Sequence, residues 1–161
     1  MAGDPLRLDQ QLCFALYSAS RAVIRAYGPL LEPLGVTYPQ YLTLLALWGE
    51  DGVPVKRLGE QLALDSATLT PLLKRLEQQG LVERRRDRDD ERVVRIHLTA
   101  AGRALRSKAR QVPAQLACRA GYDTVDRAAL ARLARLREEL TALTRRLDPP
   151  AQLPPDGQPM R

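Results

Sequence analysis

The stretch that decides the fold is LDSATLTPLLKRLEQQG at residues 64–80, followed by LVERRRDRDDERVVRIHL at residues 81–98. Apolar residues at three- and four-residue spacing predict a helix over residues 67–79, and Gly80 stands where that helix should end. A capped turn separates it from a brief helix predicted over residues 56–64. This pairing predicts a helix-turn-helix, although an ordinary helical hairpin with polar caps explains these residues equally well. The leucines of the predicted inner face are Leu69, Leu72, Leu73 and Leu76.

Residues 81–98 predict a β-hairpin, because two β-like runs flank a charged, turn-prone tip. A hairpin directly after a recognition-type helix is the wing of a winged helix, and arginine at its tip suits a narrow, electronegative minor groove. The hairpin is nevertheless locally neutral, because acids at 83, 87, 89, 90 and 91 match arginines at 84, 85, 86, 88 and 92. Charge alone therefore leaves a merely solvated hairpin open, and the prediction of a wing rests on its position.

Polar and basic side chains of these two elements are the predicted DNA contacts. We expect the first turn of the helix to reach base edges in the major groove. Asp90 precedes Arg92 by two residues, and we expect it to hold the Arg92 guanidinium in one orientation. The predicted DNA-binding residues are Ser66, Thr68, Thr70, Pro71, Lys74, Arg75, Arg86, Asp90 and Arg92.

Two further helices are predicted before this stretch. Residues 12–27 show helical periodicity, with Asp9 as the expected cap and the Gly-Pro pair at 28–29 as the expected end. Residues 37–49 predict a second helix, which begins with a Thr cap and a Pro in its first turn and is apolar nearly all round, as a core helix is. Residues 53–55 are too short for more than a small edge strand.

The C-terminal part predicts an association surface. A helix from residue 99 to 112, interrupted by Pro113, continues to Cys118, and Thr124 or Asp126 is the expected cap of a last helix. The last helix carries an apolar stripe that needs a partner, so with the N-terminal helix it predicts a homodimer interface. The stripe consists of Leu130, Leu133, Leu136, Leu140, Leu143 and Leu147.

Composition narrows the class of protein. The 161 residues, 45% of them hydrophobic, suffice for one core, which predicts a single domain, and the formal charge of +6 permits a nucleic-acid partner. No stretch approaches the roughly 18–20 apolar residues of a membrane span, and no signal pattern is visible, so we expect a cytoplasmic protein without a membrane partner. Two cysteines and one histidine without a Cys-x-x-Cys pair predict neither a disulfide framework nor a zinc site, and we expect no cofactor.

The whole pattern resembles the MarR family of dimeric winged-helix regulators, through residues 62–98. Within it, LDQQLCFALYSASR at residues 8–21 and TYPQYL at residues 37–42 resemble the organic hydroperoxide sensors of the OhrR type. The resemblance covers roughly residues 6–118. It implies a mainly α fold with a small β wing, organised as a single domain with dimerisation helices (6–36), winged helix-turn-helix (37–98) and further dimerisation helices (99–147). The proline-rich composition of residues 148–161 predicts a disordered tail.

The resemblance also implies a function. A homodimer would bind double-stranded DNA at a pseudopalindromic operator and repress a peroxide-detoxification gene until organic hydroperoxide oxidises Cys13. Tyr27 and Tyr38 would hydrogen-bond that thiol, and Tyr17 would line the same pocket. Cys118 resembles the second cysteine of a two-cysteine subclass and would form an intersubunit disulfide with Cys13. Phenol hydroxyls stabilise a thiolate, which is the nucleophile toward peroxide.

Other interpretations remain open on the residues alone. Cys13 on an apolar helix face is more often a small buried hydrophobe, and Cys118 is alternatively a passive core thiol. A regulator released by a small lipophilic or phenolic ligand, with Cys13 incidental, is the second hypothesis. A thiol peroxidase is the third and weakest, because it leaves the winged helix unexplained.

Overall fold

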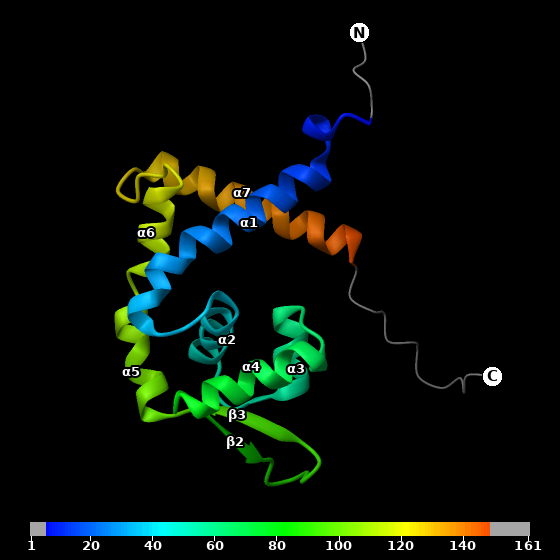
Figure 1. Cartoon of the computed structure of the whole chain (residues 1–161), viewed down its shortest axis with the longest axis vertical. Coiled ribbons are helices and arrows are strands. Elements are labelled where there is room, and N and C mark those ends of the chain that lie inside the picture. Colours follow the sequence, from blue (N-terminus) through cyan, green and yellow to red (C-terminus); the bar gives the residue numbers. More distant parts are fainter. Residues whose placement is uncertain (1–5, 149–161) are drawn as a thin grey trace, which may run out of the picture. The chain divides into compact units, whose positions relative to one another are not determined.

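The computed structural model describes residues 6–148, which form helices and one small sheet (Figure 1). The chain divides into a larger compact unit that ends at Leu116 and a smaller unit that begins at Ala117. The larger unit contains η1 (Leu8–Gln10), α1 (Leu12–Leu31), η2 (Glu32–Leu34), α2 (Tyr38–Gly49), β1 (Val53–Pro54), α3 (Val55–Leu62), α4 (Ser66–Gln78), β2 (Val82–Arg86), β3 (Val94–Leu98) and α5 (Ala100–Ala109). Helix α6 (Val112–Arg119) crosses the division, and α7 (Arg127–Leu147) belongs to the smaller unit.

The sheet has three antiparallel strands in the order β1-β3-β2. Strands β2 and β3 form the predicted hairpin, in which Val82 pairs with Leu98 and Arg86 with Val94. Strand β1 lies at the edge, as predicted, and this position tolerates Pro54 because proline has no N–H to donate to a ladder. The predicted fold class, mainly α with a small β wing, is confirmed.

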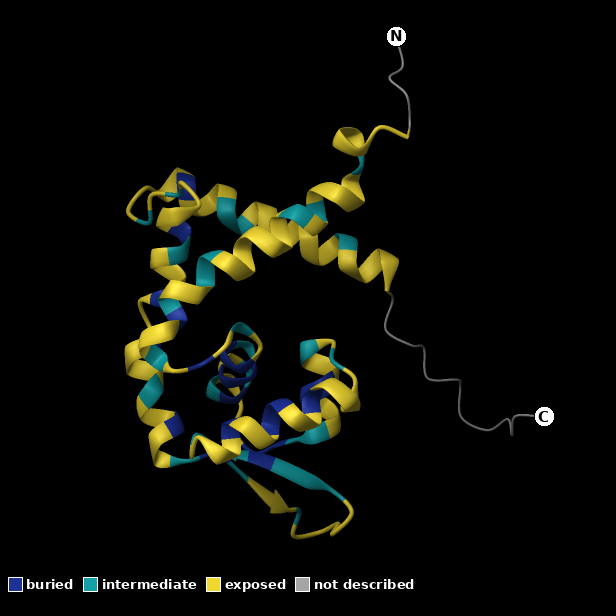
Figure 2. Ribbon diagram, in the orientation of Figure 1, coloured by how far each residue is buried: buried dark blue, intermediate teal, exposed yellow. Residues whose placement is uncertain are grey.

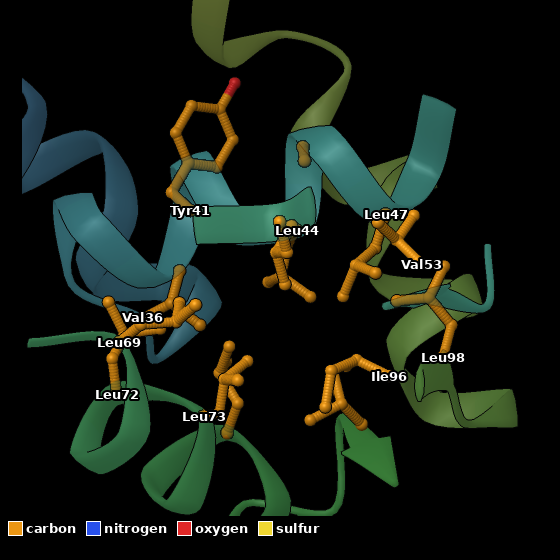
Figure 3. Packing of buried hydrophobic residues seen from close by; sticks show 14 of the residues in the cluster. Val36, Tyr41, Leu44, Leu47, Val53, Leu69, Leu72, Leu73, Ile96 and Leu98 are labelled. Atoms are coloured by element: carbon orange, nitrogen blue, oxygen red, sulfur yellow. The ribbon is translucent and has the colours of Figure 1, made fainter. Parts of the chain in front are cut away.

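The core of the larger unit lies between α2, α4 and the sheet. Figure 3 shows Leu44 of α2, Leu73 of α4 and Ile96 of β3 pointing toward one another, and all three are buried. Every leucine predicted for the inner face of α4 is buried, at 8% exposure or less. The core position predicted for α2 is confirmed, with Leu45 as a half-exposed exception. Burial of this kind contributes about 1.5–3 kcal/mol for each leucine.

Helix α2 begins as its sequence predicts. The Gln40 side chain accepts a hydrogen bond from the Thr37 N–H at 2.8 Å, and the two residues form a capping box with Pro39 in the first turn. Gln40 also donates to Gln79 Oε1 at 3.2 Å, and Gln79 donates to the Gly35 carbonyl at 3.1 Å. These bonds tie the start of α2 to the end of α4.

Two predictions for the N-terminal helix are wrong. Asp9 does not cap α1, because it lies in η1 and pairs with Arg7 at 2.7 Å, while Gln11 occupies the N-cap position and its side chain donates to the Arg7 carbonyl instead of capping the helix. Helix α1 also continues past Gly28 and Pro29 to Leu31. A proline removes one intrahelical N–H, and near the helix end the packing of Leu31, 1% exposed, offsets that loss.

The C-terminal helices also differ from the prediction in their bounds. Thr99 caps α5 by accepting from Gly102 N at 3.0 Å, but α5 ends at Ala109 rather than at residue 112. Pro113 then lies in the first turn of α6, where a proline needs no hydrogen-bonding partner. A new helix therefore starts just before Pro113, and Pro113 does not interrupt an old one.

The smaller unit consists mainly of α7. Asp126, rather than Thr124, is its cap and accepts from Ala128 N at 2.8 Å. Ala117 and Ala129 are buried, whereas the α7 leucines are not: Leu136 and Leu140 are 43% and 41% exposed (Figure 2). Asp148 is the C-cap of α7, and the rest of the predicted tail, residues 149–161, lies outside the described residues.

Candidate DNA interface and thiol site

The turn before α4 holds that helix close against α3. Ala63 ends α3 in the left-handed region at φ 52°, and Leu64 N donates to the Gly59 carbonyl at 2.9 Å. Gly59 leaves little room, because a Cβ there would lie 3.0 Å from the Leu64 carbonyl oxygen. Asp65 then caps α4 by accepting from Thr68 N at 2.7 Å. The predicted helix, turn and second helix are therefore present.

Every side chain predicted to contact DNA is exposed. On α4, Thr68, Thr70 and Arg75 face solvent while Leu69 and Leu73 fill the core, so the polar stripe is free for a ligand (Figure 2). Beside this stripe a shallow pocket of about 210 Å³ separates α4 from the start of α2. Its lining residues are Thr37, Pro39, Gln40, Thr68, Pro71, Leu72 and Arg75.

The wing is held in shape by Asp87. Its side chain accepts from Asp89 N at 2.9 Å and from Asp90 N at 3.3 Å, and it forms an ion pair with Arg95. The hydrogen bond from Arg95 holds the pKa of Asp87 below its usual value. Arg95 also donates to the Gly52 carbonyl at 3.0 Å, which anchors the hairpin beside β1. The tip is therefore an ordered loop rather than a free one.

The predicted role of Asp90 toward Arg92 is wrong in one respect. Asp90 Oδ1 accepts from the backbone N–H of Arg92 at 3.0 Å, not from its guanidinium. The reason is local: a carboxylate two residues before an N–H closes a tight side-chain turn, which leaves the longer arginine side chain pointing outward. Arg92 is exposed, and Arg86 lies on the same hairpin with a 3.3 Å bond to the Glu91 carbonyl.

A second ion pair joins the wing to α4. Arg84 Nε lies 3.3 Å from Glu77 Oε2, and the Arg84 backbone N–H donates to Glu77 Oε1 at 3.2 Å. Arg84 Nη2 donates to the Thr70 carbonyl at 3.3 Å. The sequence analysis did not predict this pair. Glu77 lies on α4 and Arg84 lies seven positions later on β2, so neither helical nor strand periodicity relates the two residues.

Cys13 is exposed and lies in the first turn of α1, one residue after Leu12. In the described chain it is therefore not the small buried hydrophobe that local residues favoured. The first turn of a helix is where the helix dipole favours negative charge. One turn later, Tyr17 is 58% exposed, and its hydroxyl accepts from Arg21 at 3.2 Å.

The rings of Tyr27 and Tyr38 are in contact in a tilted arrangement, with centroids 4.8 Å apart, and the Tyr27 centroid also lies 5.7 Å from that of the buried Tyr41. Burial, and after it the neighbouring Tyr41 and Tyr38, raise the pKa of Tyr27 to about 12. Burial also raises the pKa of Tyr38. Both phenols therefore keep their protons at neutral pH and remain able to donate hydrogen bonds.

The thiol and the tyrosine pair do not meet within one chain. Cys13 and Tyr27 stand fourteen residues apart on the same helix, α1. At about 1.5 Å per residue, this separates their backbones by roughly 21 Å. Only Tyr17 is close enough in sequence to share the helix surface around Cys13.

Cys118 is also exposed, near the end of α6, and its Sγ lies 4.0 Å from the Thr124 hydroxyl. It is therefore not a core thiol in the described chain. Among residues 6–148, no group of His, Cys, Asp and Glu side chains is arranged to hold a metal ion. Within the same range, no helix has the length and apolar character needed to span a membrane.

Comparison with known proteins identifies the fold. A family model for the transcriptional regulator SarA/Rot matches residues 25–109. The organic hydroperoxide resistance transcriptional regulator of Bacillus subtilis (strain 168) is 54% identical over 110 residues, which cover 68% of this chain and 75% of that protein. The chain is a SarA/MarR-family winged-helix transcriptional regulator. Its homologues are named as regulators of a DNA-binding family without enzymatic activity, which sets the peroxidase hypothesis aside.

Two solved structures of AbfR from Staphylococcus epidermidis resemble this regulator. Reduced AbfR bound to DNA is 36% identical, with a TM-score of 0.69 over 91% of this chain and 99% of that one. Overoxidized AbfR bound to DNA is 37% identical, with a TM-score of 0.66 over 89% and 98% of the two chains. The regulator therefore shares its fold with a protein that binds DNA.

Proposed function

We propose that this regulator is a homodimeric repressor that senses organic hydroperoxides through Cys13 and releases its operator when that thiol is oxidised. The observation that carries the proposal is the placement of an exposed thiol at one end of α1 and a protonated tyrosine pair at the other. The similarity to a hydroperoxide resistance regulator supports the choice of signal. The protein would act in the cytoplasm, where its operator lies.

A second copy resolves the separation of these groups. If α1 packs antiparallel against α1 of a partner subunit, Cys13 of one copy comes to the level of Tyr27 and Tyr38 of the partner subunit. The surface of α1 suits such packing, because Phe14, Val23 and Ile24 are 38–45% exposed in one chain. Tyr17, which follows Cys13 by one helical turn, would complete the pocket from the same copy.

The chemistry that follows is a two-electron oxidation. The Cys13 thiolate attacks the terminal peroxide oxygen, the O–O bond breaks, and a proton converts the leaving alkoxide to an alcohol. The product is a Cys13 sulfenic acid. Tyrosine hydroxyls that donate to the thiolate stabilise the reactive form before this step.

We further propose that Cys118 of the partner subunit resolves the sulfenic acid. Its thiol attacks the Cys13 sulfur, water leaves, and an intersubunit disulfide forms. That bond requires the two Cα atoms to come within about 4.4–6.8 Å of each other. The strain or movement needed to reach this distance would displace the DNA-reading elements.

The domain assignment follows from the same model. Residues 6–36 and 99–147 would supply the dimer interface, and residues 37–98 read the DNA, with the predicted residues of α4 and the wing as contacts. Two-fold symmetry would space the two α4 helices about 34 Å apart, which suits a pseudopalindromic operator.

A mobility-shift assay tests the proposal. The probe is a DNA duplex selected by the wild-type protein from a random library, here called the selected operator. Cumene hydroperoxide should release wild-type protein but not Cys13→Ser. If Cys13→Ser responds as the wild type does, or if only a phenolic ligand releases the wild type, the redox function is wrong and ligand control replaces it.

Non-reducing gels test the role of Cys118. After cumene hydroperoxide, the wild type should run as a disulfide-linked dimer, and Cys118→Ser should not. A peroxide-dependent dimer band with Cys118→Ser would remove Cys118 from the mechanism and leave Cys13 as the sensor.

A further inference from the structure

The Glu77–Arg84 ion pair connects the two elements that read DNA, and neither residue is among the predicted DNA contacts. Glu77 lies in the last turn of α4, and Arg84 lies in the middle of β2. Both carboxylate oxygens of Glu77 are used, one by the Arg84 backbone N–H at 3.2 Å and one by its Nε at 3.3 Å.

The same arginine also reaches the first half of α4. Arg84 Nη2 donates to the Thr70 carbonyl at 3.3 Å. One guanidinium thus spans α4 from Thr70 to Glu77, nearly two helical turns, and its own backbone is part of the wing strand. We call Glu77, Arg84 and the Thr70 carbonyl the wing brace.

We infer that the wing brace positions the wing relative to α4, so that α4 in the major groove and Arg92 in the adjacent minor groove engage one operator together. Arg84 and Glu77 are therefore positioning residues for DNA binding, and neither needs to touch DNA.

The geometry favours positioning over direct contact with a phosphate. The Arg84 guanidinium is engaged by Glu77 and by Thr70, and the Arg84 side chain is only 33% exposed. A rigid link lowers the entropy lost when both elements dock at once, because the wing need not be ordered on binding. The hairpin has separate support from the Asp87–Arg95 ion pair and from the bond between Arg95 and the Gly52 carbonyl, so loss of the brace should alter the wing's direction and not unfold the hairpin.

The direction in which a Glu77 substitution changes DNA affinity distinguishes the positioning role from a simple effect of charge. By charge alone, Glu77→Gln removes a negative charge from a DNA-binding face and should strengthen binding. The wing brace predicts weaker binding. Because exposed ion pairs contribute only modestly, Glu77→Gln and Arg84→Gln should each weaken binding to the selected operator about twofold to fivefold.

The experiment measures affinity for the selected operator by fluorescence anisotropy over a range of salt concentrations. The variants are Glu77→Gln, Arg84→Gln and the double variant, with Glu50→Gln as the control because Glu50 is in an exposed ion pair with Arg57 at 2.8 Å. If the pair positions the wing, the two single variants should lose the same amount of operator affinity, and the double variant should lose no more than either. The salt dependence of binding should be the same for both single variants, and the control should bind as the wild type does. Circular dichroism melts identify any variant that is simply unfolded.

Hydroxyl-radical footprints of the selected operator provide a measurement that a change in folding stability alone would not alter. In both single variants, the outer positions of the operator, which face the wings, should lose protection, and the central positions should keep it. The inference is overturned if Glu77→Gln binds as tightly as the wild type or more tightly while Arg84→Gln alone loses affinity and shows a weaker salt dependence. Arg84 would then contact a phosphate directly. It is equally overturned if the two losses add in the double variant.

Discussion

The winged helix-turn-helix, residues 37–98, is assembled within one chain, whereas the proposed thiol pocket around Cys13 is not. Leucines of α4 are buried against α2 and the sheet, and the wing is joined to α4 by the Glu77–Arg84 ion pair and to the residue before β1 by the bond from Arg95 to the Gly52 carbonyl. On α1, by contrast, the exposed thiol stands roughly 21 Å from the tyrosines that the proposed chemistry needs. In the proposed function, DNA reading would be a property of one fold and sensing a property of two copies. Four predictions sharpen this contrast.

The largest effect is expected at the junction of the reading region with α5. A Cβ at Gly102 would lie 2.0 Å from the Leu81 carbonyl oxygen, a backbone atom that has no freedom to rotate away. Gly102→Ala should therefore lower the free energy of unfolding by about 3 kcal/mol or more, measured by urea denaturation. Gly49→Ala is the matched control: Gly49 is the last residue of α2 and its Cβ would meet nothing within 4 Å, so this substitution should not lower the free energy of unfolding. Equal stability of the two variants would contradict the tight packing described here.

The next effect concerns the wing. Arg92 is exposed at the hairpin tip, and Arg92→Ala should weaken binding to the selected operator by about 1–3 kcal/mol while leaving folding and association unchanged. Arg135→Ala on α7, which removes an exposed arginine paired with Glu139, is the control. Unchanged operator affinity of Arg92→Ala would refute the wing as a DNA contact.

A substitution on the proposed association surface of α7 should have a smaller effect, and this effect should be on dimerisation. Leu140 on α7 is 41% exposed in one chain, so Leu140→Ala removes little packing from an isolated copy. If α7 is buried in a dimer, the substitution should weaken dimerisation by about 1–2 kcal/mol. Sedimentation equilibrium should show dissociation at higher protein concentration than for the wild type. Identical association would exclude Leu140 from the interface.

The smallest effect is a titration. The pKa of Tyr27 is raised to about 12, so between about pH 10 and 12 the unfolded chain releases a proton that the folded chain keeps. Folding stability should therefore fall as pH rises through that window, and be fully present below it. Tyrosinate absorbance should show a latest ionisation, near pH 12, that Tyr27→Phe lacks. Ionisation of all tyrosines near pH 10 would contradict the buried pair.

The sequence predicted the helices and hairpin of the winged helix-turn-helix well because their determinants are local. The leucine spacing of α4, the cap before it and the hairpin after it each lie within a few residues. The errors arose where tertiary packing overrides a local rule. Pro29 does not end α1, because Leu31 packs into the core. The wing brace was not predicted, because Glu77 and Arg84 belong to different elements.

The site around Cys13 was predicted from resemblance, and spacing explains why no other route existed. Helical periodicity places Cys13 and Tyr17 on one surface but separates them from Tyr27 by most of α1. The spacing of residues within α1 does not show which side chains of a second copy would lie beside Cys13.

Complementation between subunits tests the central claim most directly. Cys13→Ser subunits keep their tyrosines, and Tyr27→Phe/Tyr38→Phe subunits keep their thiol. In purified heterodimers of the two, a thiol that meets tyrosines of the partner subunit should form sulfenic acid with cumene hydroperoxide as fast as a wild-type thiol, although Tyr27→Phe/Tyr38→Phe homodimers react more slowly. Dimedone labelling measures both rates. If the heterodimer remains as slow as the double-phenylalanine homodimer, the pocket is not formed between copies and the account is wrong.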